Sequence, residues 1–245
     1  WYLNTHTTNK AEACVLGELN KETSFLLKRW NVSEPVLIEN VTAEDSVVIV
    51  DTNNPQELPK NILDANILQI IDHHMLAGGL STRKPIDVTI KTVASTATVI
   101  YDLIHKDNAD HIDNLPENMA GLLMSAILSD TLAFRSPTTT PRDKEVAEKI
   151  ATALGLDIQS YANEMFKAKS DVSDFTDKGL VHLDSKKSPL GDKNVRVSVV
   201  ETTDPESILA RKAGIVAAIE AIKNEENDVD DVLFFIVDIL KEEAT

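Results

Sequence analysis

Three aspartates stand at the ends of apolar segments and are the first residues that could do chemistry. Asp51 follows the β-branched run Val47–Val50, Asp72 follows the apolar run Asn66–Ile71, and Asp130 ends a third apolar stretch. The carboxyl ends of strands line the ligand crevice of open α/β sheets, so a carboxylate there is well placed to bind a ligand. Aspartate also starts turns after strands, and for each of the three taken alone that structural role is the simpler interpretation.

The tripeptide Asp72-His73-His74 favours a functional site. Adjacent imidazoles directly after a strand point in different directions, so one can bind a metal ion while its neighbour reaches toward a substrate. Asp72 can hold the ring N–H of a histidine as an outer-shell partner. Aspartate and histidine ligands without thiolates suit a hard or borderline divalent cation such as Mn²⁺ or Mg²⁺.

Strands and helices alternate along the part of the chain that carries these residues. The short runs at 47–50 and 66–71 are bounded by turn-prone residues, as buried parallel strands are. Helices are predicted from Ser95 to about His105, from Pro116 onward, from Pro141 to Ala153, and over 158–168. This alternation predicts an α/β fold with a parallel sheet flanked by helices.

A polar stretch, Lys169–Asp177, lacks apolar periodicity and is predicted to be a linker. It separates a large domain over 1–168 from a smaller α/β domain over 178–245. The smaller domain is expected to contain a strand near Val195–Val200, a helix from about Pro205 to Ile222 and a strand over Val232–Ile239. Because the sequence opens inside a predicted helix without a methionine, and stops soon after a strand, we expect it to be part of a longer protein.

The charge and composition of the chain narrow the classes of partner that it can bind. Lys and Arg total 24 against 40 Asp and Glu, so the formal net charge is −16. Nucleic-acid binding rests on cationic faces, so no nucleic-acid partner is expected. No apolar run reaches the roughly 18–20 residues that cross a bilayer, so no membrane partner is expected either. Cys14 is the only cysteine and no secretion signal is visible, which predicts a soluble, cytoplasmic protein. Such an acidic protein can act on an anionic substrate only where metal ions invert the local field.

Two segments resemble a known family. The run IDHH with the preceding VDTN, and the long block GLLMSAILSDTLAFRSPTTTPRD, resemble the DHH phosphoesterase superfamily. Within it the match is to the manganese-dependent (family II) inorganic pyrophosphatases, over essentially the whole chain. The resemblance implies a DHH domain over 1–168 and a DHH-associated C-terminal domain over 178–245, with the active site in the cleft between them.

The resemblance also implies an activity and a metal centre. The activity is hydrolysis of inorganic pyrophosphate to two phosphates by a metal-activated hydroxide at a two-metal site. Asp51 would bridge two Mn²⁺ ions, His73 would bind one of them, and Asp130 would supply another shared carboxylate. Co²⁺ is an alternative to Mn²⁺, and Mg²⁺ is expected to accompany the substrate.

Three further roles follow from the resemblance. His74 would contact the phosphate substrate, Asp72 would orient the site, and Lys186 would grip the substrate from the C-terminal domain. The simpler interpretation of Lys186 is one member of an ordinary surface pair with Lys187. A homodimer is implied, with the edge of the larger domain's sheet as the contact.

The sequence departs from the family pattern in three places. The family's first motif, GH-x-x-PD-x-D, would lie before Trp1, and its SRKK motif would lie after Thr245. Thr52 stands where the family often has a histidine beside the bridging aspartate. We therefore expect this stretch alone to be inactive or nearly so, and the protein with both ends restored to be active.

Two other functions remain open from the sequence. One is a prune-like exopolyphosphatase, which shares the two-domain plan but acts on longer phosphate chains. The other is a non-catalytic binding protein that has lost the first metal motif.

Overall fold

The structure is a computed structural model that describes residues 1–107, 115–191, 193–226, 228–241 and 243–245. The chain divides into two compact units, Trp1–Met165 and Phe166–Thr245, and the division falls inside helix α6 (Ile158–Lys169). The stretch 169–177, predicted to be a linker, runs from the end of α6 to the start of α7 (Asp177–Leu183).

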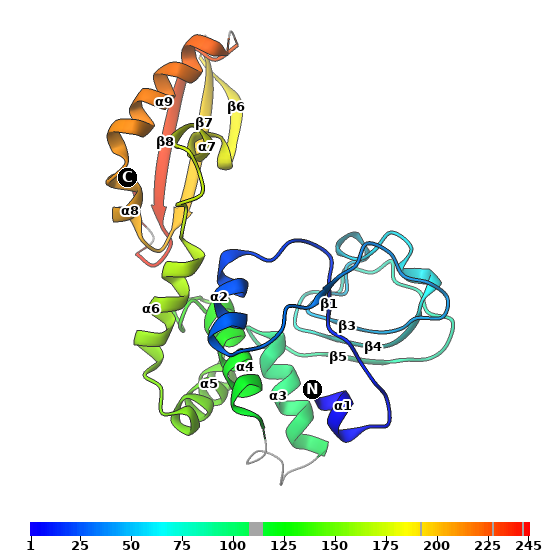
Figure 1. Ribbon diagram of the computed structural model, residues 1–245. Helices are drawn as coiled ribbons and strands as arrows, with labels where there is room; N and C mark the ends of the chain where they lie inside the picture. The colour runs from blue at the N-terminus through cyan, green and yellow to red at the C-terminus, as the bar shows by residue number, and fades with distance from the viewer. Residues whose placement is uncertain (108–114, 192, 227, 242) are drawn as a thin grey trace. The chain divides into compact units, whose positions relative to one another are not determined.

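The first unit is built on a parallel sheet of three strands in the order β3-β4-β5 (Figure 1). Its strands are β3 (Ser46–Val50), β4 (Asn66–Asp72) and β5 (Asp87–Ile90). Ile49, Ile67 and Ile70 lie in a buried cluster with Val41 and Ile62. The strands predicted from the β-branched runs are confirmed. The edge strand β5 was missed, because four residues with two exposed positions carry little pattern.

A bulge interrupts the pairing of β3 with β4. Val47 pairs with Ile67, but Val48 pairs with Gln69, so Leu68 is an extra residue on β4. The Leu68 side chain is 44% exposed, whereas Ile67 and Ile70 on either side are buried. Beyond the bulge the register is regular to Val50 and Ile71. The irregularity is thus confined to the half of the sheet away from the strands' carboxyl ends.

Two helices of the first unit begin at the capping residues expected from the sequence. Helix α3 (Thr96–Asp107) follows Ser95, whose hydroxyl accepts a hydrogen bond from Ala97 N–H at 3.2 Å. Helix α5 (Pro141–Leu154) opens with a capping box at Thr140 and ends at Gly155, with φ of 64°. The other helical elements are α1 (Tyr2–His6), α2 (Lys21–Arg29), η1 (Pro55–Glu57), η2 (Ile62–Asp64) and α4 (Glu117–Asp130).

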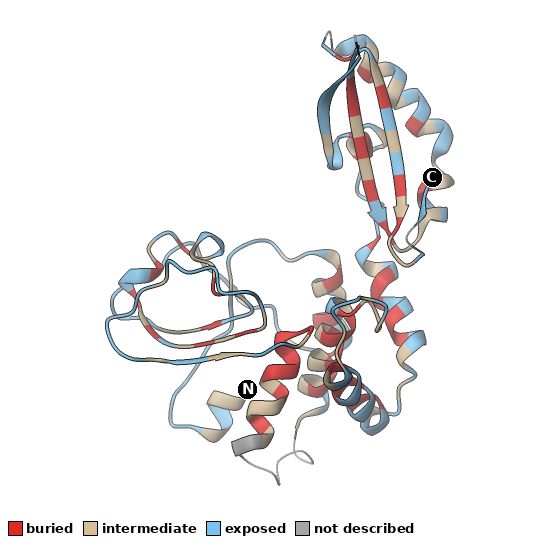
Figure 2. Ribbon diagram, turned by 180° about the vertical axis from the view of Figure 1, so that it is seen from behind, coloured by how far each residue is buried: buried red, intermediate tan, exposed pale blue. Residues whose placement is uncertain are grey.

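Burial concentrates on the helices that follow the sheet. Figure 2 shows α3 buried along most of its described length, and Val99, Met124 and Ile127 are fully inaccessible. Two short strands, β1 (Cys14–Val15) and β2 (Val36–Leu37), form a separate parallel pair. Within the described ranges, no helix is both long enough and apolar enough to cross a membrane.

The second unit has a mixed sheet with the order β6-β7-β8-β9. The long central strands β7 (Lys193–Thr202) and β8 (Asp231–Asp238) are parallel, and β6 (Ser185–Leu190) and β9 (Glu243–Ala244) add antiparallel edges. Helices α7 and α9 (Lys212–Glu225) cover one face, and the core includes Leu180, Val200, Ile215, Ile222 and Ile236 (Figure 1). The smaller α/β domain expected from the sequence is confirmed in its layers.

One predicted helix of this unit is split in two. The sequence predicts a continuous helix over 205–222, but α8 (Pro205–Leu209) ends before α9 begins. The guanidinium of Arg211, at the break, donates to the Asp177 carboxylate at 2.8 Å and to the carbonyl oxygens of Val172 and Phe175. These hydrogen bonds hold Arg211 against the start of α7, an interaction that helical periodicity does not reveal.

A charged cluster ties the end of α9 to three other elements. The Glu226 carboxylate lies 2.5 Å from Arg196 on β7, 2.9 Å from Lys187 on β6 and 3.6 Å from His182 on α7. The hydrogen bonds from Lys187 and Arg196 lower the pKa of Glu226 from 4.5 to about 2. Since the folded-state pKa lies below the unfolded one, these pairs stabilise the unit above about pH 4.5 and lose that effect as the pH falls toward 2.

Replacement of this carboxylate should be costly only where it is ionised. We expect Glu226→Gln to lower the free energy of unfolding by about 1–2 kcal/mol at pH 7, a value reduced by solvent screening of a partly exposed cluster. The loss should shrink progressively between pH 4.5 and pH 2. Urea unfolding followed by circular dichroism at several pH values measures it. Glu225→Gln removes the neighbouring carboxylate, which pairs with Lys178, and is the matched control that should cost under about 0.5 kcal/mol. An equal loss for both variants would contradict the prediction.

Candidate metal centre

Parallel pairing of β3 and β4 brings the predicted site residues together. Asp51 directly follows β3, and its backbone N–H donates to Ile71 O at 3.0 Å, extending the ladder by one bond. Ile71 pairs with Val50 and is followed by Asp72, His73 and His74. Because both strands run in the same direction, their carboxyl ends meet at one edge of the sheet. The side chains of Asp51 and of the Asp-His-His tripeptide therefore emerge next to one another.

Three of these residues form a group of metal-ligand type. Asp51, His73 and His74 each offer a ligand atom, and these atoms lie within 4.8 Å of one another. His73 Nε2 lies 3.6 Å from Asp51 Oδ1. Ligands at about 2.0–2.2 Å from one ion are at most about 4.4 Å apart, so this pair fits a shared ion and the full group needs only a small closing movement. Imidazole and carboxylate donors together suit Mn²⁺.

The tautomer of His73 is set by a backbone carbonyl. His73 Nδ1 lies 3.2 Å from Val93 O, and because a carbonyl only accepts, Nδ1 carries the hydrogen. The lone pair of the neutral ring is then on Nε2, the nitrogen that faces Asp51. The side chain of His73 is 16% exposed, against 61% for Asp51. The ring therefore presents the lone pair of Nε2 toward Asp51, an orientation that would suit a metal ligand.

Asp72 is the buried centre of the site. It is fully inaccessible, and its carboxylate accepts hydrogen bonds from His73 N–H at 2.7 Å and His74 Nδ1–H at 2.8 Å. Burial, the largest single effect, raises the pKa of Asp72, but hydrogen bonds from Asn53, His74 and His73 together hold it below its ordinary value. The sequence allows Asp72 to accept a hydrogen bond from a histidine ring N–H, and in the structure that donor is His74.

Asn53 is a site residue that sequence reasoning missed. It is buried, and its amide donates to Asp72 Oδ2 at 2.6 Å and to Met75 O at 3.0 Å. Its carbonyl oxygen accepts from Ala77 N–H at 2.7 Å. One side chain therefore joins the turn after β3 to the loop after β4. The feature of the sequence that could have pointed to Asn53 is its position two residues after Asp51.

The position that departs from the family pattern has a local role. The Thr52 hydroxyl donates to Glu57 Oε2 at 2.5 Å and accepts from Asn54 N–H at 3.0 Å. Hydrogen bonds from Thr52, which has the larger effect, and from Asn54 lower the pKa of Glu57. Thr52 thus orders the turn into η1 and adds no imidazole to the site.

Asp130 is not a member of the Asp51–His73–His74 group. It is the last residue of α4 and is exposed. The preceding Ser129 donates from its hydroxyl to Glu22 Oε2 at 3.0 Å, so the end of α4 contacts α2. Leu132, Ala133 and Phe134 follow with φ of 48°, 50° and 72°, which is a rare run for residues with side chains. The role of Asp130 as a metal ligand stays a prediction.

Lys186 and Lys187 differ in their surroundings. Lys187 Nζ lies 2.7 Å from Asp228 and 2.9 Å from Glu226, which raises its pKa. Lys186 is exposed on the edge strand β6, and within the described part of the chain no hydrogen bond or ion pair engages its side chain. The two are therefore not an equivalent surface pair. Lys186 belongs to the second unit, and its contact with substrate stays a prediction.

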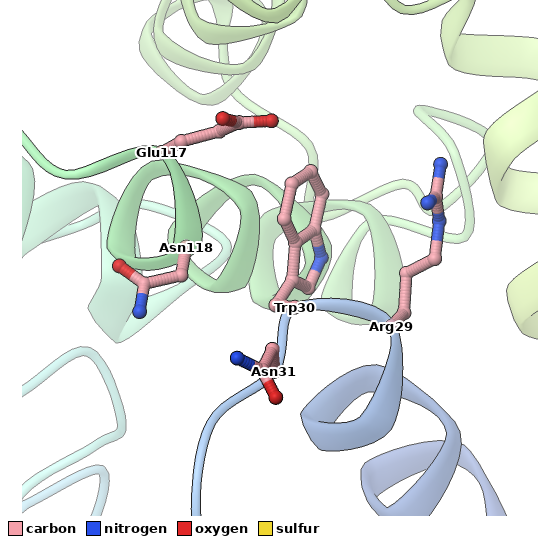
Figure 3. A pocket seen from close by; sticks show the side chains of 5 residues that line it. All are labelled: Arg29, Trp30, Asn31, Glu117 and Asn118. Carbon is pink, nitrogen blue, oxygen red and sulfur yellow. The ribbon is translucent and has the colours of Figure 1, made fainter.

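A separate hollow of about 400 Å³ lies where α2 ends near the start of α4 (Figure 3). Its lining residues are Arg29, Trp30, Asn31, Glu117 and Asn118, none of which belongs to the metal-ligand group. Trp30 is packed tightly: a Cβ on Gly121 would come within 2.1 Å of its ring, and its Nε1–H donates to Tyr161 Oη at 2.7 Å. The hollow is therefore the rim of a packing contact between two helices.

Comparison with known proteins places this geometry in a family. The model of the DHH family N-terminal domain matches residues 6–127, and that of the DHHA2 domain matches residues 163–245. A manganese-dependent inorganic pyrophosphatase of Methanocaldococcus jannaschii is 38% identical over 233 residues, covering 93% of this chain and 74% of that protein. A probable manganese-dependent inorganic pyrophosphatase of Lactobacillus acidophilus is 34% identical over 244 residues, covering 99% and 76%.

A solved structure supports the same assignment. The crystal structure of a proposed family II inorganic pyrophosphatase from Methanococcus jannaschii is 38% identical, with a TM-score of 0.66 over 94% of this chain and 76% of that one. The two family models, together with the Asp-His-His tripeptide at the edge of the sheet, define a protein of the DHH class with a DHHA2 domain. Within that class, the chain belongs to the manganese-dependent inorganic pyrophosphatases. The resemblance inferred from the motifs is confirmed.

The backbone conformation of Asp51 allows its effect on folding stability to be tested separately from its effect on Mn²⁺ affinity. Asp51 has φ of 64°, a conformation that favours glycine and costs a residue with a Cβ about 1 kcal/mol or more. We expect Asp51→Gly to be more stable than Asp51→Ala by about 1 kcal/mol, while both variants lose Mn²⁺ affinity to the same extent. Chemical denaturation and isothermal calorimetry measure the two quantities. A more stable alanine variant would show that the left-handed conformation is absent in solution.

Proposed function

We propose that this protein hydrolyses inorganic pyrophosphate to two phosphates with manganese as its metal. The observation that carries the proposal is the Asp51–His73–His74 group, whose ligand atoms lie within 4.8 Å of one another. It occurs in a chain 38% identical to a manganese-dependent inorganic pyrophosphatase over most of its length. The formal charge of −16 supports a metal requirement, because a polyanionic substrate needs local cations to approach this protein.

Asp51 and His73 are the residues proposed to hold the metal. When bound, divalent cations neutralise phosphoryl oxygens and bring the pKa of water toward neutrality. The carboxylate of Asp51 has two oxygens and 61% exposure, so it can serve two ions at once. The ring of His73 is mostly buried and already has Nε2 directed toward Asp51. The chain thus supplies one exposed bridging ligand and one rigid terminal ligand.

His74 is proposed to contact the phosphate substrate, oriented by Asp72. The Asp72 carboxylate binds His74 Nδ1–H at 2.8 Å, which leaves Nε2 as the free end of the ring. The His74 side chain is 53% exposed, so that end is open to a ligand. Asp72 is itself held by Asn53 and by two backbone N–H groups, so the ring has a fixed base. Such an arrangement directs a donor at a phosphoryl oxygen without reorganisation.

The number and kind of ions are a finer part of the proposal. We propose two Mn²⁺ ions bridged by Asp51, with Asp130 as a second shared carboxylate, Co²⁺ as a substitute and Mg²⁺ accompanying the substrate. Paired divalent ions would supply positive charge to phosphoryl oxygens, and Asp51 and Asp130 would hold them. Asp51 and His73, the two members of the described group proposed to hold metal, would leave most coordination positions of two ions to other ligands.

The proposed activity is tested by phosphate release in the presence and absence of Mn²⁺. The protein expressed with its complete coding frame should hydrolyse pyrophosphate only with the metal. Asp51→Asn should lower the rate at least about a hundredfold, because loss of a bridging carboxylate removes several kcal/mol of transition-state stabilisation. Near-normal turnover by this variant would contradict the bridging role.

Two controls sharpen that test. Asp64→Asn makes the same charge change at an exposed position of η2, in the same unit, and should leave the rate unchanged. Tripolyphosphate offered in place of pyrophosphate separates the pyrophosphatase from an exopolyphosphatase. Faster release from tripolyphosphate than from pyrophosphate would favour the exopolyphosphatase instead.

Lys186 is proposed to neutralise charge on the substrate. Both lysines are exposed, but Lys187 is engaged by Asp228 and Glu226, so the two form a matched pair of positions that differ in their ion pairs. We expect Lys186→Met to lower kcat/KM for pyrophosphate by about tenfold to a hundredfold. Lys187→Met should change it by less than about threefold and lower the stability of the second unit instead. Steady-state kinetics and thermal melts measure both, and the reverse pattern would assign the role to Lys187.

Assembly and location complete the proposal. We propose a homodimer formed at the β5 edge of the three-stranded sheet, where β5 pairs only with β4 among the described strands. An unpaired edge strand offers backbone donors and acceptors to a second copy. We also propose a cytoplasmic location, consistent with the free thiol of Cys14.

A further inference from the structure

A second fully buried carboxylate lies behind the metal-ligand group. Asp143, in the first turn of α5, is inaccessible to solvent. Its Oδ2 accepts from Ala94 N–H at 3.0 Å and from Thr140, and its Oδ1 accepts from the Thr98 hydroxyl at 2.6 Å. Four donors from three segments thus converge on one side chain. A buried charge is tolerated only with such complete satisfaction, so its place is tightly determined.

The backbone N–H that Asp143 binds belongs to the same peptide group that binds His73. The C=O of Val93 and the N–H of Ala94 are the two polar ends of one planar unit. His73 Nδ1 donates to Val93 O at 3.2 Å, and Ala94 N–H donates to Asp143 at 3.0 Å. The peptide is therefore held between an imidazole on one side and a carboxylate on the other.

Planarity and polarisation make this arrangement more than a packing contact. Because the peptide is rigid, the hydrogen bond to Asp143 fixes the direction in which Val93 O points. An anionic acceptor on the N–H also increases the negative charge on the carbonyl oxygen of the same unit, which strengthens the bond from His73. Metal-bound histidines commonly donate their other ring N–H to a carboxylate or carbonyl, which fixes the tautomer and raises ligand basicity. Here a carboxylate acts on the histidine through an intervening peptide.

We infer that Asp143 is a positioning residue for His73, acting through the peptide group that joins Val93 to Ala94. The inference rests on the proposed role of His73 as a metal ligand. Asp143 holds His73 with its hydrogen on Nδ1 and its lone pair on Nε2, 3.6 Å from Asp51 Oδ1. It touches neither metal nor substrate.

The first readout is the tautomer of His73 in the metal-free protein. Long-range ¹H–¹⁵N NMR of the histidine rings should show His73 in the Nδ1–H form in the unmodified chain. In Asp143→Asn, the neutral amide weakens the bond to Ala94 N–H, and a mixture of tautomers is expected. Mn²⁺ affinity, measured by calorimetry, should fall about tenfold, the lower end of the effect of removing an outer-shell partner.

A matched control tests whether general loosening explains the change. Thr98→Val removes a hydrogen bond to Oδ1 of the same carboxylate but leaves the Oδ2 bond to Ala94. It should lower stability while leaving the His73 tautomer and Mn²⁺ affinity unchanged. If Thr98→Val shifts the tautomer as much as Asp143→Asn, the inference is wrong.

A second variant covers the case in which Asp143→Asn does not fold. Replacing Ala94 by lactic acid removes its N–H and makes the Val93 carbonyl a weaker, ester acceptor, so the whole link from Asp143 to His73 is perturbed while the Thr98 and Thr140 donors stay in place. It should produce the same tautomer mixture, and an unchanged His73 would overturn the inference. If the unmodified protein binds no Mn²⁺, the proposed function fails, whereas the metal-free tautomer measurement still decides the role of Asp143.

Discussion

The site depends on the pairing of two parallel strands at their carboxyl ends. The hydrogen bond from Asp51 N–H to Ile71 O, at 3.0 Å, is the last rung of the β3–β4 ladder. It sets an exposed carboxylate beside the histidines that follow β4, and it does so with Asp51 in a left-handed conformation. Because neighbouring residues on a strand face opposite sides, a different register would separate these ligands. The geometry of the metal-ligand group therefore depends mainly on how the two strands pair, and to a smaller extent on the side chains themselves.

Two buried carboxylates fix what the ladder brings together. Asp72 and Asp143 are both inaccessible, and each accepts hydrogen bonds from several segments. Asp72 holds the His74 ring directly, whereas Asp143 meets the peptide to which His73 donates. Buried anions of this kind lock their surroundings because every lost donor leaves an uncompensated charge. The hydrogen bonds that the two carboxylates accept offset the cost of their desolvation, and the same bonds restrain the surroundings of His73 and His74.

The sequence predicted the strands β3, β4, β7 and β8, most helices and the Asp51–His73 neighbourhood, because apolar periodicity and strand-ending acids are local signals. It missed Asn53 and Asp143, since a hydrogen bond from residue 53 to residue 72, or from 94 to 143, leaves no pattern along the chain. It also missed the break at Arg211, which arises from contacts with residues 172–177. Candidate site residues can be predicted from the sequence. The residues that orient them by hydrogen bonds cannot, because those contacts depend on the folded backbone.

The bulge at Leu68 gives β4 one residue more than its partner needs. Without that residue, the burial of 66–72 would alternate regularly between partly covered and covered positions. The register downstream, from Gln69 to Asp72, would be preserved. Position 68 is therefore a site where one residue can be deleted from the strand, in evolution or by design. The alignment of the strands at their carboxyl ends would stay the same.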